Sequence, residues 1–230
     1  MTHVSRRAVV GLLAAALLAG PASAHSLEEL SQSFVNEEKY FQSFDAEAPR
    51  FTLQDGDGRT ISLADFRGKV VVLHFIYTNC PDFCPLHAEK IAEAQKMVNI
   101  TPMKDQVQFI SITTDPKRDT GKVLSDYGDN HGLDPVNWTF LTTAPGQAED
   151  TTLKIAESYG LKFVMTKDGA QMHGVVTHVI DQDGRLRARF HGLKFQSLNL
   201  VVYVNALVNK VQMPHADDEP GFWEKLKEWF

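Results

Sequence analysis

The hydrophobic pattern of the chain switches repeatedly between strand-like and helix-like stretches. Nearly continuous β-branched and aromatic runs at 69–77 and 107–113 predict strands that are buried on both faces, and residues 138–142 predict a third. Between and after these runs, apolar residues recur at helical spacing. Such stretches predict helices over 86–98, from Asp119 or Thr120 toward His131, over 147–159 and over 196–209.

Two Asp-Gly turn signals, at residues 55–58 and 183–184, predict β-hairpins on either side of this alternating region. The predicted hairpin strands cover 50–54 and 60–63, and 173–180 and 185–190. Strands that alternate with helices, together with an N-terminal β-hairpin, indicate an α/β fold. We therefore expect a mixed central sheet with helices on both faces.

The segments that flank this region have their own patterns. Residues 25–44 carry apolar side chains at roughly helical spacing and predict a helical N-terminal extension to a single domain over 45–210. Residues 211–230 form a tail with a short amphipathic helix, in which the aromatic side chains gather on one side. Two placements stay open for this helix, at a membrane interface or packed on its own domain.

Residues 1–24 have the features of an export signal. Arg6 and Arg7 precede an apolar run, and Ala22-Ser23-Ala24 supplies a cleavage site. The run is shorter than the ~20 apolar residues that span a bilayer. The arginine pair leaves both the twin-arginine and the general secretory route open. The mature chain is therefore expected in the periplasm, where a cysteine pair can stay oxidised.

The composition excludes several classes of protein. With 230 residues, 43% of them apolar, the chain can build a sizeable core, so extensive disorder is not expected. A net charge of −6 argues against nucleic-acid binding, which needs a basic face. The chain has two cysteines, Cys80 and Cys84, too few for a disulfide-stapled mini-fold.

The cysteine pair lies where a buried strand meets the start of a helix. There the helix dipole and unpaired N–H groups stabilise a thiolate, so a lowered cysteine pKa is expected. Residues i and i+4 share one helical face, which brings both sulfurs within reach of one ion. Two thiolates suit Cu(I), and an added imidazole also holds Cu(II). A structural disulfide and a redox dithiol would use the same two residues and stay open, whereas a zinc site would want a second cysteine pair.

The residues around the pair carry a resemblance to a known family. The run over 75–85, Phe-Ile-Tyr-Thr-Asn-Cys-Pro-Asp-Phe-Cys-Pro, and the element at 115–120, Asp-Pro-Lys-Arg-Asp-Thr, resemble the two signatures of the Sco family, also called SenC. The resemblance covers roughly residues 45–210. It implies a thioredoxin-like fold, one copper ion per chain as Cu(I) or Cu(II), and delivery of that copper to the binuclear copper site of cytochrome c oxidase.

The resemblance also implies a third copper ligand, a histidine that precedes the last hairpin. The family's spacing of eleven residues to the hairpin glycine, here Gly184, favours His173 over His178. His178 is instead expected to be a strand histidine satisfied by a hydrogen bond. Met172 stands where the family often has Asp, which places a soft thioether beside the site.

Four other histidines have weaker claims to a role. His74 is expected in the core, and His131 is expected to cap the end of a helix. His87, three residues after Cys84, could tune the thiolates or bind metal weakly. His25 would become the N-terminus after cleavage and could chelate copper, although most chain termini are simply mobile.

These features predict a periplasmic copper chaperone. Cys80, Cys84 and His173 would bind copper and pass it by ligand exchange to an apo copper subunit of the oxidase, or exchange it with another periplasmic donor or acceptor. The rival is an enzyme, a thiol–disulfide oxidoreductase that reduces the acceptor's cysteines before metal insertion. In that role the cysteine pair would be catalytic, with Cys80 as the attacking thiol.

Overall fold

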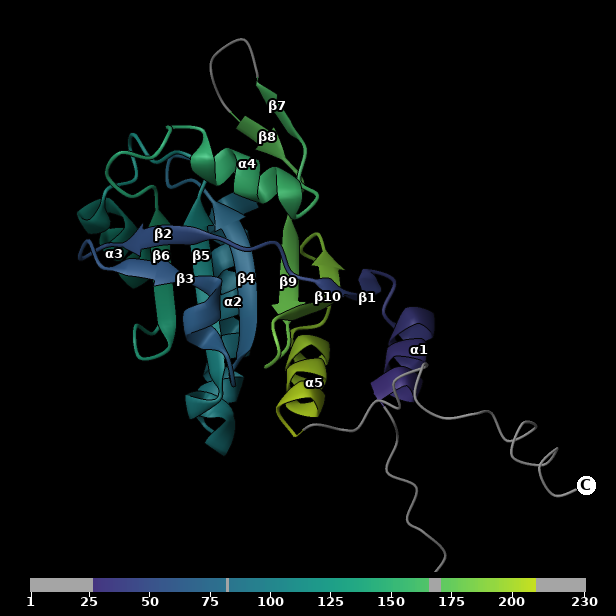
Figure 1. The fold of residues 1–230 in the computed structure, drawn as a ribbon. Coiled ribbons are helices and arrows are strands. Elements are labelled where there is room, and N and C mark those ends of the chain that lie inside the picture. Colours follow the sequence, from purple (N-terminus) through teal and green to yellow (C-terminus); the bar gives the residue numbers. More distant parts are fainter. Residues whose placement is uncertain (1–26, 82, 166–170, 210–230) are drawn as a thin grey trace, which may run out of the picture.

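The computed structural model describes residues 27–81, 83–165 and 171–209, and at residues 164–165 and 171–173 it describes the backbone alone. Eight of the described strands form one mixed sheet (Figure 1). Their bounds are Phe41–Glu47 (β1), Thr52–Asp55 (β2), Thr60–Ser62 (β3), Val70–Ile76 (β4), Val107–Thr113 (β5), Trp138–Thr142 (β6), Val176–Ile180 (β9) and Arg185–His191 (β10). The order across the sheet is β1-β10-β9-β4-β5-β6-β2-β3.

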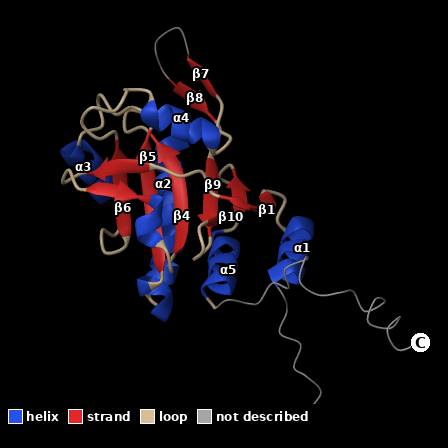
Figure 2. Ribbon diagram, viewed as in Figure 1, coloured by secondary structure: helices blue, strands red, loops and turns tan. Residues whose placement is uncertain are grey.

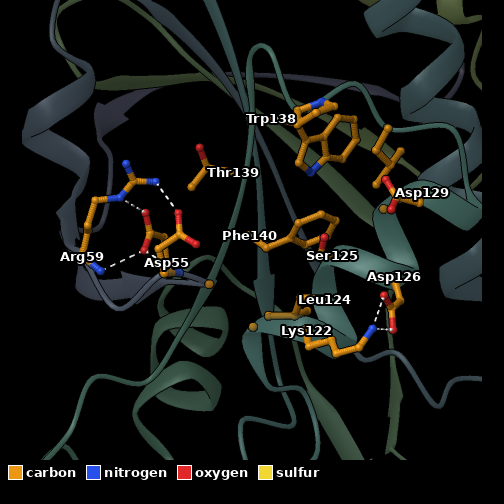
Figure 3. Close-up of a pocket in the computed structure, with 16 residues that line it drawn as sticks. Asp55, Arg59, Lys122, Leu124, Ser125, Asp126, Asp129, Trp138, Thr139 and Phe140 are labelled. Carbon is orange, nitrogen blue, oxygen red and sulfur yellow. Dashed lines mark hydrogen bonds and ion pairs between the residues drawn. The ribbon is translucent and has the colours of Figure 1, made fainter.

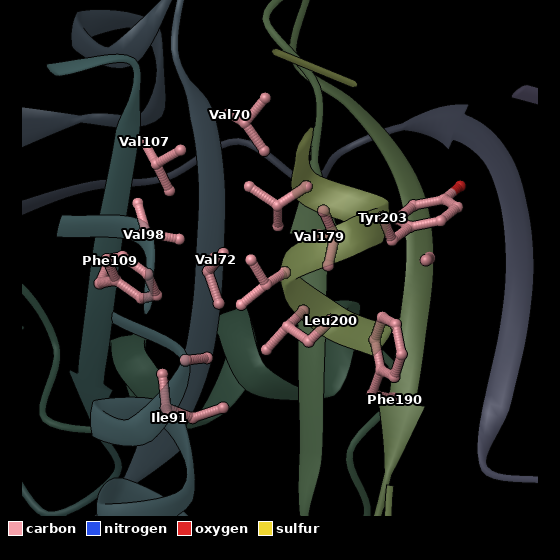
Figure 4. Close-up of a cluster of buried hydrophobic side chains, with 14 of the residues drawn as sticks. Val70, Val72, Ile91, Val98, Val107, Phe109, Val179, Phe190, Leu200 and Tyr203 are labelled. Carbon is pink, nitrogen blue, oxygen red and sulfur yellow. The ribbon is translucent and has the colours of Figure 1, made fainter. Parts of the chain in front are cut away.

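Helices cover both faces of this sheet, as the sequence predicts (Figure 2). Their bounds are Leu27–Glu37 (α1), Phe83–Asn99 (α2), Gly121–Asn130 (α3), Thr151–Ser158 (α4) and Ser197–Val208 (α5), with single 3₁₀ turns at Leu63–Phe66 and Pro102–Asp105. One core packs α2 and α5 against Val70 and Val72 of β4 (Figure 4). The other packs α4 against Val71 and Leu73 on the opposite face.

Strand β4 lies in the middle of the sheet, between β9 and β5, and therefore every one of its side chains is buried. It pairs in parallel with β5 and antiparallel with β9. A strand enclosed by helices on both faces has no polar face, which is why its sequence reads as a continuous apolar run. The strands predicted from the runs at 69–77 and 107–113 are confirmed.

The N-terminal part differs from the prediction. The stretch predicted to be helical ends at Glu37, and Phe41 begins strand β1, which spans the predicted domain boundary at residue 45 and pairs antiparallel with β10. Phe41 lies 5.3 Å from Phe190 and 5.1 Å from Tyr203, measured between ring centroids. The partners of this strand come from the far end of the chain, so local spacing did not reveal it.

The strand predicted over 173–180 is interrupted. Gln171–His173 (β8) pairs with Phe163–Met165 (β7) in a separate two-stranded ribbon, and β9 begins only at Val176. The hairpin predicted at residues 55–58 is confirmed, with β2 and β3 paired around it.

Two predicted segments lie outside the described residues, namely the export signal over 1–24 and the tail over 211–230. His25 lies outside them as well. Within the described ranges, no helix combines the length and apolar character that crossing a bilayer requires.

Candidate metal centre

The cysteine pair lies at the junction between β4 and α2, as predicted. Cys80 is partly exposed, whereas Cys84, in the first turn of α2, is 4% exposed, and the two are not joined by a disulfide. The backbone N–H of Cys84 donates a hydrogen bond to the sulfur of Cys80 at 3.4 Å, and the N–H of Cys80 donates to the carbonyl of Tyr77 at 3.2 Å. The start of α2 therefore directs one of its N–H groups, that of Cys84, onto the sulfur of Cys80.

The expected lowering of the cysteine pKa is wrong for Cys84. A hydrogen bond to Cys80 raises the pKa of the Cys84 thiol well above its ordinary value, and burial raises it further. The charges of Cys80 and Asp119 act in the same direction. Cys84 therefore keeps its proton longer than an exposed thiol would, and Cys80 is the sulfur that an incoming reactant meets first.

Asp119 holds the cysteine loop in place. Its fully buried carboxylate accepts hydrogen bonds from the backbone N–H of Thr78 at 3.1 Å, from the Thr78 hydroxyl and from the hydroxyl of Thr113. The alternative that Asp119 caps α3 is wrong, because Thr120 occupies the cap position and the Asp119 side chain turns toward the loop. The Asp115–Thr120 element marks Asp119 as a residue of interest in the sequence. Its bond to Thr78 crosses 41 residues, so local spacing could not reveal that partner.

Three of the histidines are core residues. His74 and His178 are fully buried, and burial is the main cause that lowers the pKa of each to about 3, so both are neutral near pH 7. His178 Nε2 lies 3.1 Å from the carbonyl oxygen of Tyr159, so this strand histidine makes a hydrogen bond, as predicted. His87 is 2% exposed, and its Nε2 shares a hydrogen bond with the hydroxyl of Thr177 at 2.8 Å.

His131 ends α3 as predicted. Its backbone N–H donates to carbonyls of the last turn, and its Nδ1 lies 3.2 Å from the carboxylate of Glu89 on α2. The neighbouring Tyr127 belongs to the same buried cluster as Cys84, and its hydroxyl is buried with no hydrogen-bond partner among the described residues. No motif or spacing in the sequence singles out this tyrosine.

His173 is the last residue of β8, where it pairs with Phe163 of β7. Because β9 runs antiparallel to β4 with Leu73 opposite His178, the start of β9 lies at the same end of the sheet as the end of β4. The chain from His173 enters β9 at this end, and the chain leaving β4 reaches Cys80 from it. Figure 1 shows the β7–β8 ribbon beyond this end of the sheet.

The donor set fits a soft metal ion. Two cysteine sulfurs four residues apart at a helix start match the preference of Cu(I) for thiolates, and an imidazole would extend that set to Cu(II). Among the side chains that the structure describes, which do not include that of His173, no group of three His, Cys, Asp or Glu residues is arranged around a common point.

A hollow of about 550 Å³ lies between the β2–β3 turn, α3 and β6 (Figure 3). Its cations are already paired: Arg59 lies 2.8 Å from both Asp55 and Asp57, and Lys122 lies 2.7 Å from Asp126. None of the residues that line it belongs to the cysteine loop or the β7–β8 ribbon. We assign this hollow no part in the chemistry of the cysteines.

A sheet with helices on both faces and a cysteine pair between a central strand and a helix defines the thioredoxin-like class of proteins. The match to a family model narrows this class. The SCO1/SenC model matches residues 41–207, which is more than half of the chain, so the chain belongs to the SCO1/SenC family. The resemblance seen in the sequence is confirmed.

Individual relatives agree with this assignment. The SCO1 protein homolog of Bacillus subtilis (strain 168) is 28% identical over 152 residues, which cover 64% of this chain and 75% of that protein. The structure of BsSco, a member of the Sco family of cytochrome c oxidase assembly proteins, superposes with a TM-score of 0.63 at 25% identity, covering 73% of this chain and 96% of that one. Bradyrhizobium japonicum ScoI with copper bound gives 0.54 at 28% identity, covering 70% and 99%.

Proposed function

We propose that the chain is a copper chaperone that binds one copper ion through Cys80, Cys84 and His173. The observation that carries this proposal is the placement of the cysteine pair and the His173 segment at the same end of the sheet. The copper-bound relative ScoI, at 28% identity, supports copper as the ion.

Each residue of the proposed site has a different role in copper binding. Cys80, partly exposed, is the first sulfur that copper meets, and loss of the Cys84 proton then completes a two-thiolate clamp. His173 adds an imidazole nitrogen, which matters most for Cu(II). Asp119 keeps the loop that carries Cys80 in one conformation through its bonds to Thr78.

Copper is the cargo of this protein, so release matters as much as binding. Because the three ligands come from two separate elements, copper can leave stepwise as an acceptor's ligands replace them. BsSco belongs to a family of cytochrome c oxidase assembly proteins, which supports the apo copper subunit of an oxidase as the acceptor. The same ligand replacement would let the chain exchange copper with another periplasmic donor or acceptor. The export signal over 1–24 supports the periplasm as the compartment.

A thiol–disulfide reductase is the second candidate, and the unequal burial of the two cysteines favours it. In this role the Cys80 thiolate attacks an acceptor disulfide and forms a mixed disulfide. Cys84 then gives up its proton and attacks Cys80, which releases the acceptor as a dithiol. The two electrons come from the pair, which ends as a Cys80–Cys84 disulfide, so one dithiol reduces one acceptor disulfide.

Copper binding to the reduced protein separates the two functions. We expect one Cu(I) and one Cu(II) site in wild type, no binding in the Cys80→Ser/Cys84→Ser variant, and loss of Cu(II) with retention of Cu(I) in His173→Ala. The matched control His178→Phe should keep both ions. If reduced wild type takes up no copper but reduces an acceptor disulfide in one turnover, the reductase is the correct function.

The tail is a separate part of the proposal. Its aromatic side chains over 222–230 would place the chain at a membrane surface. Full-length chain should then pellet with lipid vesicles more than a chain without 216–230. Equal pelleting would show that the tail has no membrane role.

A further inference from the structure

A buried hydrogen bond connects the cysteine helix with the strand that follows His173. His87 Nε2 and Thr177 Oγ1 lie 2.8 Å apart, and the two residues are separated by 90 positions in the chain. His87 is 2% exposed and Thr177 is fully buried. A hydrogen bond this well shielded from water is costly to break, because each partner would be left unsatisfied in the core.

The two bonded residues each lie a few positions from a proposed copper ligand. His87 lies one helical turn after Cys84 on α2, and Thr177 lies four residues after His173, at the second position of β9. On β9, Thr177 lies on the same face as Val179, which packs in the core that α2 covers. The bond therefore joins helix α2, which carries Cys84, to strand β9, which the chain enters three residues after His173.

The surroundings of His87 argue against direct copper binding. Its ring packs edge-on against that of His74, with centroids 4.8 Å apart, beneath the surface of the sheet. A ligand would have to be drawn out of this core and would lose the bond to Thr177. The imidazole at this place links α2 to β9 through its bond to Thr177.

We propose that the His87–Thr177 hydrogen bond is a brace that sets the position of the His173 segment relative to the cysteine helix. His87 and Thr177 are then positioning residues for Cu(II), and neither touches the metal. This inference rests on the proposed function, in which His173 is a copper ligand. Since two thiolates suffice for Cu(I) and the imidazole is needed for Cu(II), a loosened brace weakens Cu(II) binding selectively.

The test compares dissociation constants for Cu(I) and Cu(II) in variants of the full chain. Thr177→Val removes one hydroxyl at nearly constant volume, and His87→Leu removes the imidazole. We expect each to weaken Cu(II) by about 10-fold, at the lower end of what outer-sphere partners contribute to metal affinity. Cu(I) affinity should stay within about twofold, since both thiolates are unchanged.

Further variants distinguish a brace from general damage to the core. His87→Gln keeps a group that can bond to Thr177 and should restore most of the Cu(II) affinity and the Cu(II)–thiolate charge-transfer band. The double variant His87→Leu/Thr177→Val should bind Cu(II) no more weakly than the weaker single variant. His178→Phe, an equally buried histidine at the next position of β9, should leave the ratio of the two affinities unchanged.

Two results would overturn the brace. One is an unchanged Cu(II) affinity in Thr177→Val, which also decides the matter if His87→Leu fails to fold. The other is an equal fall in Cu(I) and Cu(II) affinity, as a purely structural role would give. If instead His173→Ala binds Cu(II) like wild type, the proposed ligand set is wrong, and the brace is overturned with it.

Discussion

The two halves of the proposed copper site are built in different ways. The cysteine half lies between the central strand β4 and helix α2, and its loop is bonded to Asp119. The histidine half begins at the end of β8, in a two-stranded ribbon that, among the described residues, shares no strand pairing with the main sheet. Shifting this ribbon would therefore break no ladder hydrogen bond of the main sheet.

This difference suggests how one site can both hold and release a soft metal ion. A fixed pair of sulfurs supplies the part of the affinity that both oxidation states share. The third ligand comes from an element outside the main sheet, so its contribution can change while the core stays intact. Such a division suits a chaperone, because copper has to leave the site as well as enter it.

Breaking the support of the cysteine half should have the largest effect. Asp119→Ala leaves the N–H and the half-buried hydroxyl of Thr78, and the buried hydroxyl of Thr113, without their carboxylate acceptor. We expect the free energy of unfolding to fall by about 4 kcal/mol. Cu(I) and Cu(II) should each bind more weakly, because the loop that carries Cys80 loses its bonds to Asp119. Denaturant titration and copper titration measure the two effects.

The matched change is Asp115→Asn, four residues before Asp119 in the segment between β5 and α3. Its carboxylate pairs with the exposed guanidinium of Arg118, so the expected loss is below about 1 kcal/mol. Equal losses in the two variants would show that Asp119 is no special anchor.

Acid should lower the free energy of unfolding through one buried histidine near each half of the site, and by a similar amount for each. The pKa of His74, on the strand before the cysteines, and that of His178, on the strand after His173, are each lowered to about 3, mainly by burial. In the unfolded chain both titrate near 6.5. The stability that depends on their neutral form is therefore complete above pH 6.5 and is lost as the pH falls toward 3.

At pH 5 the loss should be about 2 kcal/mol for each histidine. His74→Phe and His178→Phe should each flatten the slope of unfolding free energy against pH by up to about 1.4 kcal/mol per pH unit between pH 6 and 4. Chemical denaturation across this range measures the slope. A slope that neither variant alters would mean that other groups control acid sensitivity.

Two glycines give a smaller contrast. A Cβ added at Gly121, at the start of α3, would lie 2.2 Å from the carbonyl oxygen of Gly56 in the β2–β3 turn. At Gly174, between β8 and β9, the nearest atom to an added Cβ is Val176 Cγ2 at 4.0 Å. Gly121→Ala should therefore cost about 2 kcal/mol of unfolding free energy and Gly174→Ala less than about 0.5. Equal decreases in the thermal unfolding temperature of the two variants would contradict this prediction.

Two buried tyrosines give the smallest contrast. Tyr159, at the end of α4 before the ribbon, donates a hydrogen bond to the carbonyl of Pro49 at 2.9 Å. The hydroxyl of Tyr127, in the cluster that includes Cys84, has no partner among the described residues. Tyr159→Phe should lower the unfolding free energy by about 1 kcal/mol, and Tyr127→Phe should leave it unchanged or raise it slightly. A larger loss for Tyr127→Phe in denaturant titration would contradict this.

Local patterns along the chain were sufficient to predict the parts of the molecule that depend on neighbouring residues. The continuous apolar run of β4, the turn between β2 and β3, and the cysteine pair at the start of α2 all follow from neighbouring residues. Burial on both faces, turn propensity and helix periodicity act over a few residues, so they are readable in one dimension. The export signal and the tail remain predictions.

The parts that depend on distant partners could be identified only in the folded chain. Phe41 begins a strand because β10 lies beside it, and Asp119 anchors the cysteine loop because Thr78 lies within hydrogen-bond reach. The bond between His87 and Thr177 crosses 90 residues in the same way. Hydrogen-bond partners and burial are set by the path of the whole chain, and therefore no local spacing encodes them.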